Sequence, residues 1–347
     1  MKTAHQSGRF VIIGENIHTS RAVKREGKHI ETLPDGRLVI RFTDPAGRPR
    51  TLTVPDAIRA SKDAERGRIR HVQAGVIAGR SGQEPDAADG RAYLQTLAVR
   101  QIAAGADYLD LNVDEISVDD AERQAAMGWL VTAIEEVTSV PVAVDSSGTD
   151  VIRAGLEAWQ GRTGRPLINS ASFERLDVLD LAAAAGSPVV ISAASPHGLP
   201  ASADERVANA SGMVSLATDR GLSLDQLYID PLVLPAAANP EAGRACLEAI
   251  AQLRARFGDA IHITGGLSNV SFGLPNRRLV NDAFISLVVE AGADSGIIDP
   301  VTSSPEEAVA IDRASRPFLL AQDLLLGRDA YGRAYLAAWR AGLLAAT

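Results

Sequence analysis

One stretch decides the fold, His262-Ile-Thr-Gly-Gly-Leu-Ser-Asn-Val-Ser-Phe-Gly-Leu-Pro-Asn-Arg-Arg-Leu-Val-Asn-Asp-Ala-Phe284. Ile261–Thr264 predict a short buried strand, and Gly265 and Gly266 remove side-chain bulk where that strand ends. A glycine pair at this position allows a tight turn or the close approach of a ligand. An ordinary strand-to-helix loop would explain the glycines alone. Amides and hydroxyls follow them and favour a binding site: Ser268, Asn269, Ser271, Asn276 and Asn281.

Short apolar runs of this kind recur along the chain, separated by amphipathic helical segments. The eight predicted strands are Phe10–Asn16, Asp107–Val113, Pro141–Asp145, Pro166–Asn169, Pro188–Ser192, Leu227–Asp230, Ile261–Thr264 and Gly296–Asp299. Apolar strands that alternate with helices indicate a parallel sheet covered by those helices. Eight such units predict an α/β fold, a (β/α)8 TIM barrel. An open doubly wound sheet is the alternative, but no Gly-x-Gly-x-x-Gly follows any predicted strand.

One segment after the first strand breaks this alternation. The turn signals Pro34-Asp-Gly36 and Pro45-Ala-Gly47 flank alternating residues, which predicts a small β-meander at about residues 28–54. We expect a helix from about Pro55 to Ala78. The whole insertion, about residues 28–85, could be a lid, a docking surface or a surface ornament. We expect one domain over residues 1–347, with C-terminal helices at about 305–347.

The composition describes a globular protein with ample core. Of its 347 residues 46% are hydrophobic and 22% charged. The net charge of −8 argues against nucleic acid or an anionic membrane as partner. No apolar run approaches the roughly 20 residues that span a bilayer, and the first ten residues lack a signal-peptide core. We expect a cytoplasmic protein in which the single cysteine, Cys246, is a buried hydrophobe.

Polar residues gather at the carboxyl ends of the predicted strands. They are Glu15, Asn16, Asp110, Asn112, Asp145, Asn169, Ser192, Asp230, Ser268, Asn269 and Asp299. In barrels of this kind that rim is the active site, and helix capping alone explains so many Asp and Asn residues poorly. No lysine follows Lys62. Carboxylates and amides suit a neutral heterocycle with adjacent N–H donors and a carbonyl, such as a pterin or guanine.

The chain resembles the pterin-binding methyltransferases, the family of the methyltetrahydrofolate:corrinoid methyltransferases and the folate domain of cobalamin-dependent methionine synthase. The matching pieces, in chain order, are Ile13-Gly-Glu15, Leu109-Asp-Leu-Asn-Val113, Val144-Asp-Ser146, Leu167-Ile-Asn-Ser170, Tyr228-Ile-Asp-Pro-Leu232, Gly266-Leu-Ser-Asn-Val-Ser271 with Asn276-Arg277, and Ile298-Asp-Pro300. They cover about residues 10–27 and 86–315. The resemblance implies a TIM barrel that binds folate at the strand ends and transfers a methyl group between N5 of (methyl)tetrahydrofolate and corrinoid cobalt.

The resemblance also implies roles for individual residues. Asp145, Asn169 and Asp230 would hydrogen-bond the pterin ring. Asn269 would reach N5 and act in catalysis together with Asp145. Further binding or supporting residues would be Glu15, Asp110, Asn112, Ser268 and Arg277.

The resemblance further implies a homodimer and a corrinoid partner. The chain lacks the Asp-x-His-x-x-Gly corrinoid pattern, so the corrinoid should arrive on a separate protein. No Cys/His zinc set exists in the sequence, and we expect no bound metal. His18 and His197 follow predicted strands, but a solvated or core histidine explains each as well.

Three alternatives stay open. A dihydropteroate synthase shares the barrel and the pterin pocket, but it would need a lysine in the loop that here reads Leu267-Ser-Asn-Val-Ser271. A pterin-binding or corrinoid-docking subunit without catalysis is the second alternative. A barrel enzyme acting on another heterocycle is the third.

Overall fold

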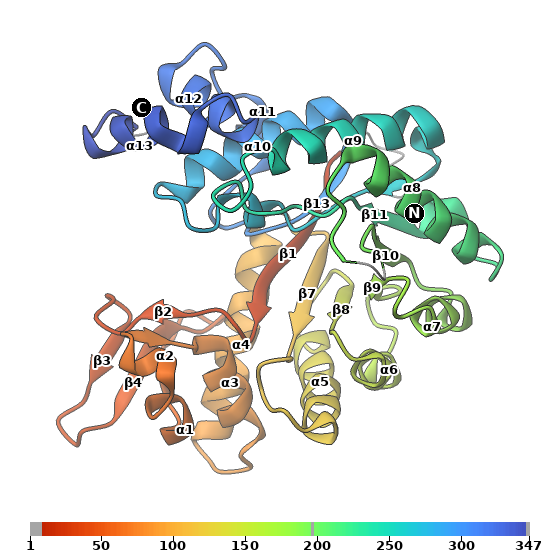
Figure 1. The fold of residues 1–347 in the computed structure, drawn as a ribbon. Helices are drawn as coiled ribbons and strands as arrows, with labels where there is room; N and C mark the ends of the chain where they lie inside the picture. The colour runs from red at the N-terminus through yellow and green to blue at the C-terminus, as the bar shows by residue number, and fades with distance from the viewer. Residues whose placement is uncertain (1–8, 196–197, 345–347) are drawn as a thin grey trace. The chain divides into compact units, whose positions relative to one another are not determined.

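The computed structural model describes residues 9–195 and 198–344, so His197 lies outside the described residues. Eight parallel strands form one sheet in the order β12-β11-β10-β9-β8-β7-β1-β13 (Figure 1). Its end strands meet at a parallel bridge between Gly266 and Ile297. The fold is therefore the (β/α)8 barrel that the sequence predicts.

The eight strands match their predicted positions closely. They are β1 (Val11–His18), β7 (Tyr108–Asn112), β8 (Val142–Asp145), β9 (Leu167–Ala171), β10 (Val189–Ser192), β11 (Leu227–Asp230), β12 (His262–Ile263) and β13 (Ser295–Ile298). The covering helices are α4 (Asp86–Ala103), α5 (Asp120–Glu135), α6 (Thr149–Ala158), α7 (Asp177–Ala185), α8 (Ala203–Thr218), α9 (Ala242–Phe257) and α10 (Arg277–Ala291). Gly186 and Gly292 end α7 and α10 in the left-handed conformation that glycine favours.

The chain divides into two compact units. Unit 1 comprises Met1–Ile13 and Ser170–Thr347, and unit 2 comprises Gly14–Asn169. In unit 2, Leu111 on β7 pairs with Val144 on β8, and both are buried. In unit 1, Ile191 on β10 pairs with Ile229 on β11, also buried. Each unit thus buries the apolar runs that predicted its strands.

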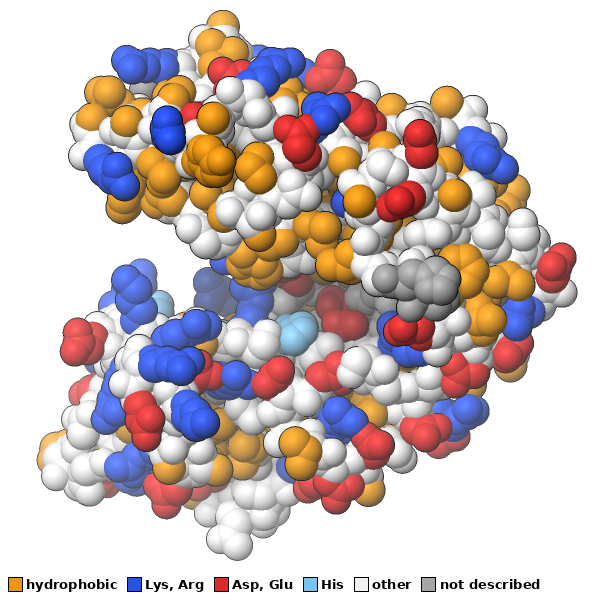
Figure 2. Space-filling view, in the orientation of Figure 1, with side chains coloured by type: hydrophobic (Ala, Val, Ile, Leu, Met, Phe, Trp, Pro, Cys, Tyr) orange, Lys and Arg blue, Asp and Glu red, His pale blue; other side chains and the backbone are white. Residues whose placement is uncertain are grey.

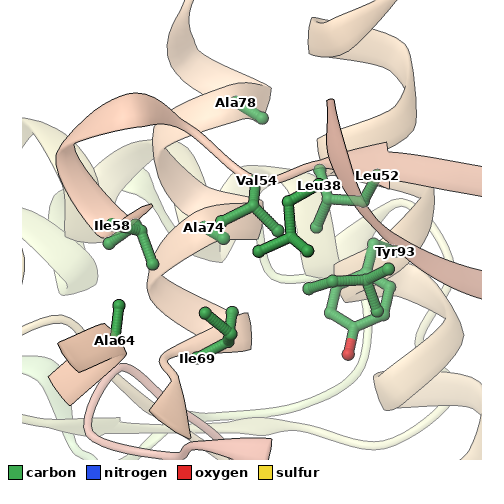
Figure 3. Close-up of a cluster of buried hydrophobic side chains, with 10 residues drawn as sticks. Leu38, Leu52, Val54, Ile58, Ala64, Ile69, Ala74, Ala78 and Tyr93 are labelled. Atoms are coloured by element: carbon green, nitrogen blue, oxygen red, sulfur yellow. The ribbon is translucent and has the colours of Figure 1, made fainter. Parts of the chain in front are cut away.

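The predicted β-meander is present in unit 2. Three antiparallel strands, β3 (Ile30–Thr32), β4 (Leu38–Thr43) and β5 (Pro49–Thr53), form a separate sheet. Leu38, Ile40 and Leu52 turn into a hydrophobic cluster together with Tyr93 of α4 (Figure 3). The insertion therefore has a hydrophobic cluster of its own, which packs it against α4 within unit 2.

The single helix expected at residues 55–78 is wrong. The segment contains α1 (Asp56–Arg59), α2 (Lys62–Glu65), β6 (Arg68–Ile69) and α3 (His71–Arg80), and β6 pairs with β2 (Val23–Lys24). Ser61 caps a new helix by accepting a hydrogen bond from the Ala64 amide. Gly67, at φ +75°, then turns the chain into β6. These local stop signals outweigh the continuous apolar pattern.

Two helices join the insertion to the barrel in unit 2. A Cβ on Gly90 of α4 would lie 2.3 Å from the backbone nitrogen of Gly79 on α3. Only glycine permits so close a helix crossing.

The C-terminal segment of unit 1 is helical but interrupted. It forms α11 (Pro305–Val309), α12 (Arg316–Leu325) and α13 (Arg333–Arg340). Gly327 and Gly332 adopt positive φ and separate the last two helices. Cys246 is fully buried in α9, as expected. Within the described residues, no helix is both long enough and apolar enough to cross a membrane.

Candidate active site

An acid–amide cluster lies in unit 2 on β7, β8 and β9, in the carboxyl-terminal part of these strands. Parallel register places Asn112 opposite Asp145, and Asp145 opposite Asn169. The Asn112 amide donates to Asp145 Oδ2 at 2.9 Å, and the Asn169 amide donates to Asp110 Oδ1 at 3.4 Å. Four predicted site residues are therefore brought together in this unit.

Asp110 is the most deeply buried member of this cluster, with 2% of its surface exposed. Burial raises its pKa well above the usual range, and the charges of Asp145 and Glu15 raise it further. The Asn169 hydrogen bond acts in the opposite direction but is outweighed. The Asp110–Asp145 pair therefore holds a proton at a higher pH than two isolated carboxyls would.

Asp114 fixes the loop after β8 and was missed by the sequence reasoning. Its carboxylate accepts hydrogen bonds from the Ser146 hydroxyl at 2.6 Å and from the Ser147 amide at 2.8 Å. These contacts hold the chain just beyond Asp145. No sequence signal identifies this role, because the two segments are about 30 residues apart.

Glu15 lies on β1, three residues before the strand ends at His18, and is engaged by Arg21. The Arg21 guanidinium donates to Glu15 Oε1 at 2.6 Å and to the Glu15 carbonyl at 2.9 Å. Glu15 therefore contributes a neutralised carboxylate, and Arg21 was not among the predicted site residues. His18 Nδ1 accepts a hydrogen bond from the Ser20 amide, so its remaining ring proton is on Nε2. Burial lowers the pKa of His18, which keeps the ring neutral.

In unit 1, Asp230 ends β11 with one carboxylate oxygen unengaged. Oδ1 accepts a hydrogen bond from the Leu232 amide at 2.8 Å, whereas Oδ2 has no hydrogen-bond partner among the described residues. Burial raises the pKa of Asp230 to about 6, against the opposing effects of the Leu232 amide and the Arg206 charge. Arg206 is itself fully buried and holds the Pro231 carbonyl at 2.9 Å.

The loop after β12 presents Asn269 in unit 1. Asn269 is half-buried in a 3₁₀ turn, Leu267–Ser271, and its side chain forms no hydrogen bond within the part of the chain described here. A Cβ on Gly266 would lie 2.7 Å from the Asn269 amide nitrogen, and one on Gly265 would lie 3.0 Å from Asp230 Oδ1. The glycine pair therefore gives space to the two side chains that the resemblance implies are functional.

Arg277 makes hydrogen bonds to the turn that contains Ser268 and Asn269. Arg277 donates to the Ser271 hydroxyl at 2.9 Å and to the Ser268 carbonyl at 2.8 Å. Its guanidinium also lies over the Phe272 ring, 4.5 Å from the ring centre. Arg277 thus fixes the turn that carries Asn269. Two further strand-end residues, Ser192 and Asp299, each accept a hydrogen bond from a backbone amide of the following loop.

Each unit therefore presents carboxylate and amide groups at strand ends, suited to recognise N–H donors and a carbonyl on a planar ring. Among the residues described, no group of three or more His, Cys, Asp or Glu side chains has the arrangement of a metal site.

Comparisons with known proteins agree with this chemistry. A family model described as pterin binding enzyme matches residues 89–299. The methylcorrinoid:tetrahydrofolate methyltransferase of Eubacterium limosum is 29% identical over 256 residues, covering 72% of this chain and 88% of its own. Methionine synthase of Mycobacterium tuberculosis is 32% identical over 238 residues, covering 62% of this chain but only 19% of that longer protein.

Solved structures show the same fold. The dihydropteroate synthase of Stenotrophomonas maltophilia superposes with a TM-score of 0.52 at 19% identity, covering 64% of this chain and 86% of its own. The chain belongs to the pterin-binding enzyme family.

Proposed function

We propose that this protein transfers a methyl group between N5 of (methyl)tetrahydrofolate and the cobalt of a corrinoid carried by a separate protein. The main observation behind the proposal is the Asn269 side chain, whose amide makes no hydrogen bond within the described residues. Asn269 lies in the loop after β12, where a dihydropteroate synthase would need a lysine. The E. limosum relative, whose name states transfer between methylcorrinoid and tetrahydrofolate, supports it.

Ring recognition is assigned to the strand ends. Asp145 and Asp230 accept hydrogen bonds from ring N–H and exocyclic amino groups, and Asn169 contributes an amide. The supporting observations are the spare Oδ2 of Asp230 and the orientation of Asp145 by Asn112. Glu15, Asp110, Ser268 and Arg277 hold the surrounding loops and charges rather than the ring.

Cobalt(I) supplies an electron pair to the methyl carbon while the C–N5 bond breaks and its electron pair returns to N5, which takes a proton. In the reverse direction N5 loses its proton, attacks the methyl carbon and releases cobalt(I). A tertiary amine is a poor leaving group, so positive character at N5 lowers the barrier.

Asn269 stabilises that positive character at N5 through its amide oxygen. An oriented polar group of this kind contributes about 2.7–4 kcal/mol, by analogy with oxyanion-hole donors. Positioning of the two reactants contributes the larger part of the rate. An amide is not an acid, so the proton comes from solvent by way of Asp145, which lies beside Asp110, a carboxyl whose pKa is raised by burial.

An anaerobic assay tests the proposal. Purified protein is mixed with methyltetrahydrofolate and cob(I)alamin, and the corrinoid spectrum reports methylcobalamin; the reverse reaction starts from methylcobalamin and tetrahydrofolate. We expect conversion, reduced in Asn269→Ala and Asp145→Ala and unchanged in Asn239→Ala, an exposed asparagine outside the site. Absence of folate binding contradicts the proposal, and folate binding without transfer in either direction favours a non-catalytic subunit.

The dihydropteroate synthase alternative is tested in the same preparation. Incubation with a pterin diphosphate and p-aminobenzoate would yield dihydropteroate if the chain were a dihydropteroate synthase. The similarity to such structures extends to the fold alone. We expect no product.

We further propose a cytoplasmic homodimer. The C-terminal segment of unit 1 exposes Leu319, Tyr331, Trp339 and Leu343, each by more than 40%. Apolar side chains gathered on such a segment favour a protein contact. Light scattering after size-exclusion chromatography should give twice the chain mass of 36.5 kDa, and a mass of one chain would contradict a dimer.

A further inference from the structure

A pocket of about 840 Å³ lies within unit 2, between the β-meander and helix α4. Its lining includes β4 and β5 residues together with His71 of α3 and Tyr93, Thr96, Leu97 and Arg100 of α4. A volume of this size falls in the range of roughly 300–1,000 Å³ that single small molecules occupy. None of the strand-end residues lines it, so it is distinct from the candidate active site.

The charge of this meander pocket is positive. Arg41, Arg50 and Arg100 line it and no Asp or Glu does, although the whole chain carries a net charge of −8. Figure 2 shows Lys and Arg side chains gathered over the meander part of unit 2. A site lined by one sign of charge in an oppositely charged protein concentrates ions of the opposite sign. The pocket therefore favours an anion.

The three arginines differ in how far they are already paired. Arg50 contacts Asp89 at 2.7 Å and Arg41 contacts Glu31 at 3.2 Å. Arg100, which is exposed, forms no ion pair with any described residue. Arg100 is thus the guanidinium available to a ligand, and its planar fork matches a carboxylate in two parallel hydrogen bonds.

The interior of the pocket is aromatic and apolar. The Phe42 and Tyr93 rings meet edge to face, with centres 5.1 Å apart and planes at 79°. Ile40, Leu97 and Val23 complete the apolar lining. Edge-to-face walls of this kind accept another flat ring.

A buried polar pair closes one side of the pocket. The Tyr93 hydroxyl and His71 Nδ1 hydrogen-bond at 2.8 Å. Burial lowers the pKa of His71 to about 4, so the imidazole is neutral at neutral pH. The positive charge is therefore on the arginines at the rim, and the interior is uncharged. An anionic group of a ligand would bind at the rim, and an apolar ring would bind in the interior.

We propose that the meander pocket binds a carboxylate-bearing aromatic molecule, with its ring packed against the Phe42–Tyr93 pair and its carboxylate on Arg100. Two sources share this chemistry: the p-aminobenzoyl-glutamate portion of a folate, and a free aromatic carboxylate. The inference does not rest on the proposed methyl transfer, since it depends only on the pocket.

Calorimetric titration of the full chain tests it, with benzoate and p-aminobenzoyl-L-glutamate as probes. Arg100→Ala removes the available guanidinium, and Arg37→Ala is the matched control. Arg37 is on the same meander but outside the pocket, and it pairs with Asp35. Both positions are exposed, so both variants should fold, which their thermal unfolding midpoints check.

We expect saturable binding of at least one probe to wild type, weakened about tenfold or more by Arg100→Ala, as loss of a hydrogen bond to a charged group implies. Arg37→Ala should bind as wild type does, and benzamide, which lacks the charge, should bind more weakly than benzoate. Failure of both probes to bind, or equal affinity in wild type and Arg100→Ala, overturns the proposal.

Two further arms assign the source. If saturating tetrahydrofolate blocks benzoate binding and a tail-free tetrahydropterin does not, the pocket holds the folate tail. If benzoate and tetrahydrofolate bind together, the pocket holds a separate aromatic carboxylate. Either result stands even if the methyl-transfer assay fails, because it is read from binding alone.

Discussion

Two aspartates of unit 1 lie at opposite ends of the parallel strands, and their pKa values are shifted in opposite directions. Asp294 precedes β13 at the amino end, where it contacts His262 Nδ1 at 2.8 Å and Arg254 at 3.0 Å. Burial opposes its charge, but the hydrogen bonds from His262 and the Ile263 amide outweigh this and lower its pKa. Asp230 ends β11 at the carboxyl end, and burial raises its pKa to about 6.

The difference shows how this barrel divides its work. At the amino end the charge of Asp294 is matched by Arg254, His262 and the Ile263 amide, and it stabilises the fold. At the carboxyl end, Asp230 has one carboxylate oxygen with no hydrogen-bond partner among the described residues. The missing hydrogen bond lowers the stability of the fold and leaves this oxygen available to a ligand. Barrels in general place stability at the first end and chemistry at the second. Four substitutions test this contrast.

The largest effect is expected at the carboxyl end, from Asn269→Ala. Loss of the oriented amide should lower the methyl-transfer rate about a hundredfold to a thousandfold. Stability should change little, because the side chain makes no hydrogen bond within the described chain. Stopped-flow spectroscopy of the corrinoid measures the rate. Asn239→Ala is the control, and an unchanged rate in Asn269→Ala would remove this residue from the mechanism.

The second effect is expected at the amino end, from Asp294→Ala. Removing one partner of the Arg254–Asp294–His262 network should lower the free energy of unfolding by about 2–4 kcal/mol. Urea denaturation measures it. Asp259→Ala is the matched control, since its contact with Arg254 is exposed and should contribute under about 1 kcal/mol. Equal losses in both variants would contradict a stabilising role for Asp294.

A third effect of opposite sign is expected for Asp230→Asn. The folded-state pKa of about 6 exceeds the ordinary 3.8, so the folded protein binds this proton more tightly and the ionised carboxylate destabilises it above pH 6. Asparagine should therefore raise the free energy of unfolding at pH 7 by on the order of 1–2 kcal/mol. The gain should shrink as pH falls below 6 and vanish near pH 4. A loss of stability at pH 7 would contradict this account.

The smallest effect is expected from Gly266→Ala. The added Cβ would lie 2.7 Å from the Asn269 amide nitrogen and should displace it, lowering the methyl-transfer rate about tenfold. Gly128→Ala in α5 is the control, because its new Cβ would meet only ordinary contacts of 3.7 Å. A full rate in Gly266→Ala would show that the position of Asn269 is not critical.

Much of the fold follows from local pattern, because each barrel strand is a short apolar run that ends in a polar residue. β11 is predicted to the residue, at Leu227–Asp230. The helix expected at residues 55–78 fails because Ser61 and Gly67 stop it locally. Apolar periodicity cannot reveal a cap that competes with it.

The candidate site is predictable only in part. Strand ends identify Asp110, Asn112, Asp145 and Asn169, and parallel register brings them together. Arg21 and Asp114 are not predictable in this way, since they act through folded-state contacts with Glu15 and Ser146. The meander pocket is likewise invisible in sequence, because its arginines are spread over residues 41 to 100.

The central claim is that folate binds at the carboxyl ends of the barrel strands and not at their amino ends. The most direct test is an equilibrium titration of tetrahydrofolate against wild type, Asp230→Asn and Asp294→Ala. It is carried out at pH 7.5 and low temperature, without urea. We expect tight binding by wild type and Asp294→Ala, and binding weakened about tenfold in Asp230→Asn, which loses charge-assisted hydrogen bonds. Equal affinity in wild type and Asp230→Asn, or a specific loss in a folded Asp294→Ala, would contradict the account.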